Sequence, residues 1–477
     1  MNSNEQTDDR SKIPEILKVG DISTDSENMS FDTLVHDPVI QSDTFVRFVL
    51  TNQGILHSFS KITFGYDAGG GQGTCPANIG IYSLIQRATL KIGTSTICEI
   101  DDFNHYMGYK SPFIHNPINY ERETYTSSRV MDRQILFDDT KGSESNVNAS
   151  GYGMKGYLEY QMEEDGEDGN LDAIQQIKLT NKPVFSISLA ELFPMLRANE
   201  LPLYLISEQV SIELHLVAPT SGLRHIFDKE AGESTGTTIN IDKTQTKLIA
   251  DYLYYTDGNV MADFEAKNKS VPIQYNYPDF RLNKRSLTKD QLETEQIIDI
   301  GGAGRVVRKV ICALENTGTP GDSAINSRFH SYCPTPDASG NKQLFVTNAL
   351  FNDRRLYPVD RSNPSVHYHD LNRTEGLFSQ AYITKSEFSK EDDDPGGIVS
   401  NYSYLGFIQK DSNEGILGRS FYYNYDTDMF NERINSRGIQ LQFNYNSMLT
   451  GDYVHRSWVE LEKTATLLNG RFSTELA

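Results

Sequence analysis

The sequence predicts an all-β protein, and three observations support that prediction. Segments such as Val210–Leu216 and Ile439–Tyr445 alternate apolar and polar residues with a period of two. Tyrosine and phenylalanine are abundant, at 26 and 23 of 477 residues, and both suit the half-buried faces of a pleated sheet. Helical patterns are few and short. Antiparallel sheets with one face over a core are therefore the expected units.

Strand signals recur along the chain between clusters of turn residues. Phe45–Leu50 is apolar on both faces, and Lys61–Phe64 forms the next signal. Phe185–Leu189 places an apolar residue at every second position. In Val306–Leu314 the apolar face is interrupted only by Arg308. These segments have the length and composition of strands.

Two short helices are expected inside connections between strands. Ser188 with Glu191, and Thr288 with Gln291, have the spacing of a capping box, in which each side chain bonds a free backbone amide of the first turn. Pro194 limits the first helix, because proline cannot continue a helical hydrogen-bond ladder.

The chain is long enough for two large β domains of about 200 residues each. Residues 1–33 are rich in Ser, Asn, Asp and Glu, so we expect a flexible N-terminal arm, with a small apolar patch at Ile13–Leu17 that could dock on a neighbour. Residues 34–262 and 263–477 are expected to form the first and second β domains. The glycine-containing stretch Thr220–Thr246 is expected to be a long connection between two strand-rich halves.

Charge and cysteine content exclude several classes of protein. The net charge of −21, with 65 acidic and 44 basic residues, argues against a dedicated nucleic-acid binder. The polar N-terminus has no apolar signal region, and no apolar run approaches the roughly 18 residues of a membrane helix. We therefore expect synthesis in the cytosol or nucleus. Four cysteines without CxxC spacing are expected to be free thiols. They are Cys75, Cys98, Cys312 and Cys333.

Five segments invite a ligand-binding interpretation, and each fails a spacing test. The glycine runs Gly69–Gly73 and Gly301–Arg305 lack the Lys-Ser/Thr pair of a phosphate loop, which favours surface loops. His367–Asp370 supplies two histidines but no third zinc ligand nearby, which favours surface histidines. The acidic segments 163–169 and 391–397 lack the spacing of a calcium loop.

Catalytic signatures are not found in the sequence either. It contains no nucleophile elbow, no zincin helix and no kinase motif set. We expect no catalytic, cofactor-binding or metal-binding residues, no cofactor, and a protein that is not an enzyme.

Four parts of the chain resemble segments of one family: residues 78–93 with 99–104, residues 185–216, residues 247–255 and residues 459–471. They look like parts of the double jelly-roll major capsid proteins of double-stranded DNA viruses, in the lineage of polinton-like viruses, virophages and nucleocytoplasmic large DNA viruses. In that family the first part is similar to an early strand pair, the second to late strands of the first roll, the third to the strand that closes this roll, and the fourth to a closing segment of the second roll. The usual opening motif of the large-virus coats is missing, which leaves the viral group open.

The resemblance implies two consecutive eight-stranded jelly rolls with short helices in long loops. It also implies a homotrimer that forms a pseudo-hexagonal capsomer and tiles an icosahedral virion shell. Its partners would be neighbouring capsomers and minor capsid or penton proteins, without sequence-specific nucleic-acid binding, and membrane contact stays open. Two other classes remain as alternatives: a β-sandwich attachment or glycan-binding spike protein, and an all-β hydrolase, for which no convergent acids or nucleophile are visible.

Overall fold

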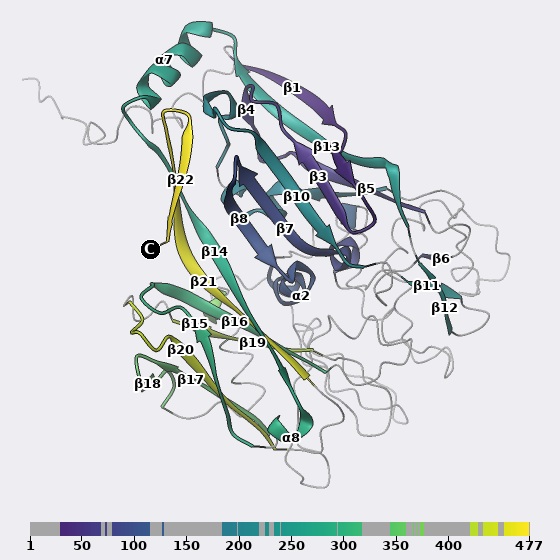
Figure 1. Cartoon of the computed structure of the whole chain (residues 1–477), viewed down its shortest axis with the longest axis vertical. Coiled ribbons are helices and arrows are strands. Elements are labelled where there is room, and N and C mark those ends of the chain that lie inside the picture. The colour runs from purple at the N-terminus through teal and green to yellow at the C-terminus, as the bar shows by residue number, and fades with distance from the viewer. Residues whose placement is uncertain are drawn as a thin grey trace, which may run out of the picture.

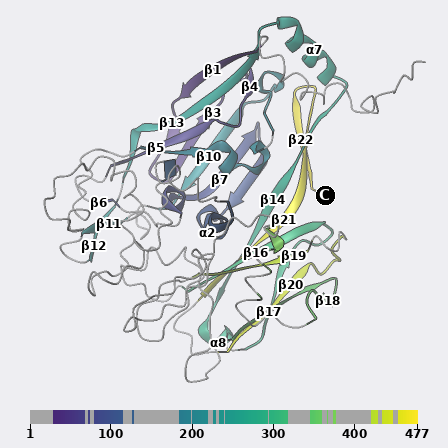
Figure 2. The same cartoon turned by 180° about the vertical axis from the view of Figure 1, so that it is seen from behind.

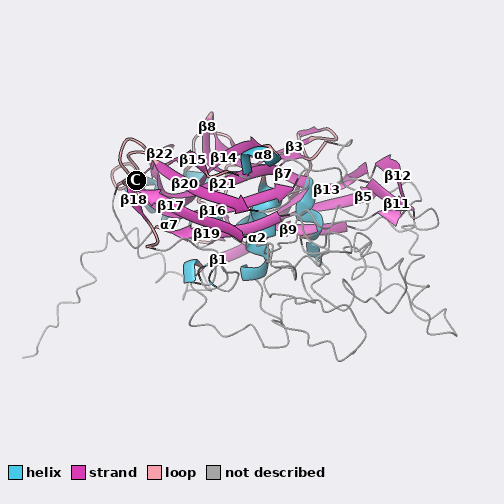
Figure 3. Cartoon of the chain, turned by 90° about the horizontal axis from the view of Figure 1, so that it is seen from below, coloured by secondary structure: helices cyan, strands magenta, loops and turns pink. Residues whose placement is uncertain are grey.

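A computed structural model describes most of the two strand-rich halves of the chain (Figure 1). The described residues are 29–67, 72–73, 79–114, 126–127, 184–197, 199–218, 225–228, 233–238, 240–292, 294–316, 344–358, 366, 370, 373–375, 420–427, 433–446 and 453–476. Strands dominate these residues, and the helices are few and short (Figure 3). The all-β class predicted from the sequence is confirmed.

The described residues of the first half form eight main strands that pair in a nested order. The first strand pairs with the last, the second with the seventh, the third with the sixth and the fourth with the fifth, all antiparallel. This nesting is the jelly-roll topology, and it folds the strands into two facing sheets. The strands are β1 (Met29–His36), β3 (Phe45–Val49), β5 (Lys61–Asp67), β7 (Ile85–Ile92), β8 (Ser95–Asp101), β9 (Val184–Ser188), β10 (Val210–Leu216) and β13 (Asn240–Tyr255).

The second half repeats the same nested pairing. Its first and last strands pair over their whole length, and the inner pairs follow in the same order. The strands are β14 (Ile273–Leu287), β15 (Gln296–Gly301), β16 (Val307–Asn316), β17 (Leu344–Phe351), β18 (Arg354–Arg355), β19 (Ser420–Asp426), β20 (Ile439–Asn446) and β21 (Tyr453–Leu468). The chain is therefore a double jelly roll, as the resemblance implied. We call residues 29–255 the first roll and residues 273–476 the second roll.

Smaller elements decorate the two rolls. The additional strands are β2 (Ile40–Gln41), β4 (Ile55–Leu56), β6 (Gln72–Gly73), β11 (His225–Asp228), β12 (Glu233–Thr238) and β22 (Arg471–Leu476). The α-helices are α2 (Phe103–Ile114), α6 (Leu189–Leu192), α7 (Gly258–Asn268) and α8 (Lys289–Leu292). The 3₁₀ helices are η4 (Gly80–Leu84), η9 (Pro194–Leu196) and η10 (Leu203–Leu205). Helix α7 connects β13 to β14, and α2 lies between the two rolls (Figures 1 and 2).

The core of each roll forms where the alternating apolar residues of its two sheets face each other. In β10, Val210, Ile212 and Leu214 are fully buried, as the alternation predicts. The intervening Ser211 and Glu213 are buried as well. Glu213 lies 2.6 Å from Lys91 on β7 and 3.7 Å from Arg47 on β3, so cross-strand ion pairs compensate its charge inside the sheet.

The capping box predicted at Thr288 and Gln291 is present, and Ser188 is the N-cap of α6. The Ser188 hydroxyl accepts a hydrogen bond from the Ala190 amide at the start of α6. At α8 the arrangement is reciprocal: the Thr288 amide donates to the Gln291 side chain at 3.0 Å, and the Gln291 amide donates to the Thr288 hydroxyl at 3.4 Å. Both helices are four residues long and lie in connections between strands.

Two boundaries expected from the sequence differ in the structure. Residues 29–33, expected to belong to the arm, are part of β1, because their backbone pairs with residues 251–255 of β13 although their side chains are mostly exposed. Residues 225–228, 233–238 and 240–246, expected to lie in a long connection, are strands. Backbone pairing with β6 and β5 outweighs the turn-like composition of this stretch. Residues 1–28 and the apolar patch at Ile13–Leu17 lie outside the described residues.

The interruption at Arg308 has a local cause. The register between β16 and β21 shifts between Val307, opposite Leu461, and Lys309, opposite Glu460. Arg308 is therefore the extra residue of a β-bulge, which aims it away from the core face. Its guanidinium donates to the Glu462 carboxylate at 2.7 Å.

Candidate functional site

The segments weighed as ligand sites do not form one in the described residues. Gly301, Gly302 and Gly304 all have positive φ and make the turn between β15 and β16, where the Gly304 amide donates to the Ile434 carbonyl at 2.8 Å. Gln72–Gly73 form β6, and the rest of the Gly69–Gly73 run lies outside the described residues. His367 and His369, the acidic segments 163–169 and 391–397, and Cys75 and Cys333 lie outside them too.

In the part of the chain that the structure describes, no group of three or more His, Cys, Asp or Glu side chains is placed to hold a metal ion. No described helix is long and apolar enough to span a membrane. Cys98 and Cys312 are buried, and burial raises the pKa of the Cys98 thiol to about 12.

The most elaborate feature of the described structure is the contact between the two rolls, which we call the inter-roll joint. The first roll contributes β8, α2 and η9, and the second contributes the outer face of the sheet β14–β21–β16–β19. The ring of Tyr106 of α2 packs at a tilt against Phe280 of β14 and edge-on against Trp458 of β21, with ring centroids 4.9 and 6.3 Å apart. All three side chains are buried, and one apolar core runs through both rolls.

A buried charge network, the Arg456 network, lies beside these aromatic rings. The Arg456 guanidinium of β21 donates to the Asp102 carboxylate at 2.8 Å and to the Glu315 carboxylate at 2.7 Å. Lys284 of β14 also reaches Asp102, at 2.9 Å, and His105 of α2 lies 3.5 Å from Glu315. Two carboxylates thus share one guanidinium, whose planar donor fork suits this geometry.

The position of Asp102 follows from the local fold. It lies between the end of β8 and the first residue of α2 with a φ of 47°, a left-handed conformation that aspartate tolerates better than most residues. Its carboxylate thereby lies at the N-terminus of α2, where the helix dipole favours negative charge. Burial alone would raise the pKa of Asp102, but the charges of Arg456 and Lys284 hold it below its ordinary value.

A second buried network, the Glu375 network, ties the other end of α2 to the second roll. The Glu375 carboxylate accepts from Lys110 at 2.5 Å, from Tyr109 at 2.7 Å and from Lys309 of β16 at 3.1 Å. The Tyr109 hydroxyl in turn accepts from Asn424 of β19 at 2.7 Å. Burial opposes ionisation, but the two lysines prevail and hold the pKa of Glu375 at about 2.

A third set of contacts joins β8 to the middle of β14 and β21. Lys463 is only 4% exposed. Its ammonium group donates to the Ile97 carbonyl at 2.7 Å and to the Asp279 carboxylate at 3.4 Å. The Tyr277 hydroxyl donates to the same carbonyl at 2.7 Å. The Trp458 indole donates to the Asp101 carbonyl at 2.8 Å. The backbone of β8 is thus held at both of its ends by side chains of the second roll.

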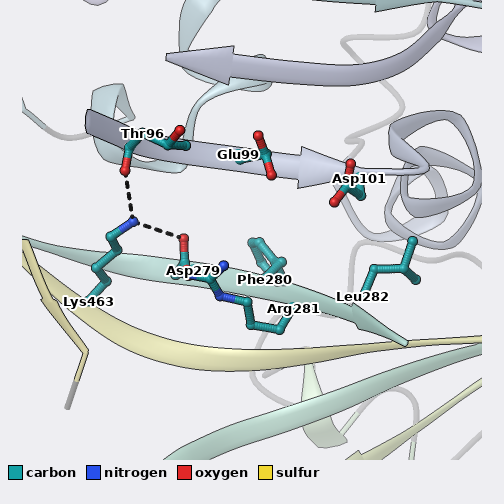
Figure 4. Close-up of a pocket in the computed structure, with 8 residues that line it drawn as sticks. All are labelled: Thr96, Glu99, Asp101, Asp279, Phe280, Arg281, Leu282 and Lys463. Carbon is teal, nitrogen blue, oxygen red and sulfur yellow. Dashed lines mark hydrogen bonds and ion pairs between the residues drawn. The ribbon is translucent and has the colours of Figure 1, made fainter. Parts of the chain in front are cut away.

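A groove of about 310 Å³ opens along this contact (Figure 4). Its walls are Thr96, Glu99 and Asp101 of β8, residues 279–282 of β14, and Lys463. The volume is at the lower end of ligand pockets, which are mostly apolar. Here the lining is largely charged, and Lys463 and Arg281 pair with Asp279. The groove is better understood as the edge of the inter-roll joint than as a ligand pocket.

Sequence reasoning did not find the joint. Its charged residues lie far apart in the chain, as with Asp102 and Arg456, which are 354 residues apart. One signal was available: Arg456 and Lys463 are charged residues within a long strand pattern, where a charge on a buried face requires a partner.

The fold has known counterparts. No protein-family model and no curated protein matches the sequence. Among solved structures, the chain is similar to "PBCV-1 virus capsid, quasi-atomic model", with a TM-score of 0.53, 10% identity, and 94% of this chain and 97% of that chain covered. It is also similar to "Crystal structure of PBCV-1 VP54 fitted into a cryo-EM reconstruction of the virophage Sputnik", with a TM-score of 0.51, 10% identity and the same coverage. A third structure, "Crystal structure of mavirus major capsid protein", has a TM-score of 0.46, 8% identity, and covers 94% of this chain and 90% of its own.

Proposed function

We propose that this chain is a structural major capsid protein of a double-stranded DNA virus, without catalytic activity. The observation that carries the proposal is the double jelly-roll fold shared with the PBCV-1 capsid structure over 94% of this chain and 97% of that one. Fold alone does not fix function. The inter-roll joint supplies a second reason, because it fixes the two rolls rigidly to each other, as a building block of a shell requires.

The joint explains how two rolls could act as one rigid body. Apolar contact alone would permit sliding, whereas the Arg456 and Glu375 networks lose directional hydrogen bonds if either roll shifts. Removing charges from water costs free energy that only well-aligned pairing repays, so a shift of either roll would leave buried charges without compensation. A subunit that packs into a regular shell requires such a fixed angle between its two rolls.

The proposed assembly is a homotrimer that forms a pseudo-hexagonal capsomer of an icosahedral shell. Three copies of two rolls give six similar units in a closed ring, which approximates the six-fold symmetry of a flat facet. Neighbouring capsomers and minor capsid or penton proteins would be the further partners, and the virion the final location. We place the division between the two rolls within α7, near residue 262, with residues 1–28 as an arm.

Negative-stain images of the purified protein test this proposal. We expect uniform particles with a pseudo-hexagonal outline and, under assembly conditions, flat arrays or closed shells. Elongated particles that bind glycans in an array assay would instead favour the attachment-protein alternative. Particles without three-fold symmetry would contradict the proposal.

A further inference from the structure

Three short segments of the second roll carry a concentration of arginine. They are residues 301–306, 351–355 and 433–438, and we call them the arginine loops. Asp353 is their only acidic residue, and all five of their arginines are exposed: Arg305, Arg354, Arg355, Arg433 and Arg437. The whole chain has a net charge of −21, so the loops form a local basic surface on an acidic protein.

Hydrogen bonds lock the three arginine loops together. The Asn435 amide donates to the Asn352 side chain at 2.7 Å, and the Asn352 side chain donates to the Arg433 carbonyl at 3.3 Å. On the other side of the middle loop, the Ile434 amide donates to the Arg305 carbonyl at 3.0 Å. The arginines therefore extend from a fixed backbone platform and lose little order when they bind a partner.

The one carboxylate of the arginine loops is already engaged within them. Asp353 accepts from the Asn435 side chain at 3.1 Å and from the Arg437 guanidinium at 2.8 Å. Within the described part of the chain, Arg354 and Arg433 form no ion pair. Figures 1 and 2 show β18, which contains Arg354, on the side of the second roll away from the first roll. The positive charge of these two residues is thus accessible to an anionic partner.

The chemistry of the arginine loops favours carboxylates on a tethered segment. The planar guanidinium donates two parallel hydrogen bonds to a carboxylate, a geometry that lysine cannot supply. A nucleic acid or an anionic membrane that approaches from solution is repelled by the net charge of −21. An acidic segment of the chain itself is held nearby at a high effective concentration, which offsets this repulsion.

The N-terminal segment has the composition and the length to be that partner. Residues 1–28 contain seven acidic and three basic residues, with two of the acidic residues adjacent at Asp8 and Asp9. They precede Met29, where β1 begins. An extended chain of this length spans about 90 Å. The segment is therefore long enough to reach across a neighbouring domain.

We propose that the acidic N-terminal segment, residues 1–28, docks on the arginine loops of the same molecule. The inference goes beyond the proposed capsid function and does not rest on it. Each ion pair would be partly exposed and would contribute little alone, so docking requires several pairs at once. It should also weaken as salt is added, because exposed charges are screened.

The mobility of the N-terminus tests the proposal. A fluorophore attached to the N-terminal amine at near-neutral pH, where this amine is less protonated than lysine, reports the motion of the segment through its anisotropy decay. In the wild type at low salt, slow tumbling of the whole protein should dominate the decay. In Arg354→Glu with Arg433→Glu, the ratio of docked to undocked segments should fall by about tenfold or more.

Two further variants make the comparison specific. Lys61→Glu with Lys243→Glu is the matched control, since it makes the same charge change at two exposed residues of the first roll and should keep the slow decay. Asp8→Lys with Asp9→Lys should release the segment from wild-type rolls. The same change should restore docking when it is combined with the charge-reversed arginine loops.

The outcomes are distinct, and all of them leave the capsid proposal in place. Equal decays in the wild type and in the Arg354→Glu, Arg433→Glu variant would overturn the inference. If that variant fails to fold, the Asp8→Lys, Asp9→Lys variant decides, and an unchanged slow decay there would contradict docking. A slow decay that disappears on dilution would contradict docking within one molecule. A mobile wild-type segment, with a DNA duplex bound through Arg354 and Arg433, would make nucleic acid the partner instead.

Discussion

The guanidinium of Arg456 lies 2.8 Å from the carboxylate of Asp102, a residue of the other jelly roll and 354 positions earlier in the chain. Both side chains are largely removed from water. Their pairing, together with Glu315 and Lys284, joins the two rolls at the point where β8 passes into α2.

Loss of the Arg456 guanidinium should destabilise the folded protein strongly. Arg456→Met would leave Asp102 and Glu315 buried without their shared cation, and breaking a buried ion pair from one side costs about 3–5 kcal/mol. We expect a clear drop in the midpoint of thermal unfolding. Arg437→Met is the control: Arg437 pairs with Asp353 at 2.8 Å but is 70% exposed, so its loss should cost at most about 1 kcal/mol. Equal effects of the two substitutions would contradict the account of the joint.

Glu375 should make the protein sensitive to strong acid. Its pKa is about 2 in the folded protein against an ordinary value of 4.5, because Lys110 and Lys309 outweigh burial. A lowered pKa stabilises the fold above pH 4.5, and this contribution, on the order of 3 kcal/mol, is lost as the pH falls from 4.5 towards 2. Unfolding should be followed across this range for the wild type and for Glu375→Gln. The variant should be less stable at pH 7 and should lose less stability in acid; parallel curves would argue against the network.

His455 should make the stability of the fold depend on pH in a second, less acidic range. It is fully buried on β21, and burial, followed by the nearby charges of Arg456 and Arg285, lowers its pKa to about 3. The unfolded chain then takes up a proton at higher pH than the folded protein does. Stability should therefore fall as the pH drops from 6.5 towards 3, by about 2 kcal/mol between pH 6.5 and pH 5.

The variant that tests this dependence is His455→Gln, which keeps a polar group near the Tyr423 hydroxyl, now 2.6 Å from the imidazole. Its unfolding midpoint should change less than that of the wild type between pH 6.5 and pH 5. His57→Gln serves as the control, because the His57 side chain is partly exposed, at 19%, and lies beside Glu200. A wild-type midpoint that is flat over this range would show that His455 does not titrate as described.

The N-terminal arm and β1 should respond differently to truncation. Deletion of residues 1–28 should leave the unfolding midpoint nearly unchanged, since their composition cannot bury enough apolar surface to offset ordering. We expect shell formation to be impaired if the apolar patch at Ile13–Leu17 docks on a neighbour. Deletion of residues 1–36 would also remove β1, which pairs with β13 along eight residues, and should lower the midpoint markedly. Equal effects of the two deletions would contradict the boundary at Met29.

The sequence was informative where burial follows a local period. The alternation in Val210–Leu216 and Ile439–Tyr445 predicted β10 and β20, because a strand with one face on a core repeats every second residue. The capping box of Thr288 with Gln291 and the N-cap hydrogen bond from the Ala190 amide to Ser188 likewise depend on residues two or three positions apart. Both kinds of signal are local.

Features that depend on distant residues were not predictable in this way. Residues 29–33 look like a polar arm, and only their pairing with β13, more than 200 residues later, makes them a strand. The bulge at Arg308 is set by its register against β21. Glu375 follows no strand pattern, and its role depends on lysines from two different elements. The joint is therefore a property of the fold and not of any one segment.

The solution mass of the purified chain tests the central claim most directly. If two rolls held rigidly by the joint are one third of a capsomer, light scattering coupled to size exclusion should give a single species of about 161 kDa, three times the chain mass of 53.8 kDa. The species should persist on dilution through the micromolar range, as expected for an interface built to close a ring. A clean monomer of one chain mass at micromolar concentration would contradict the account.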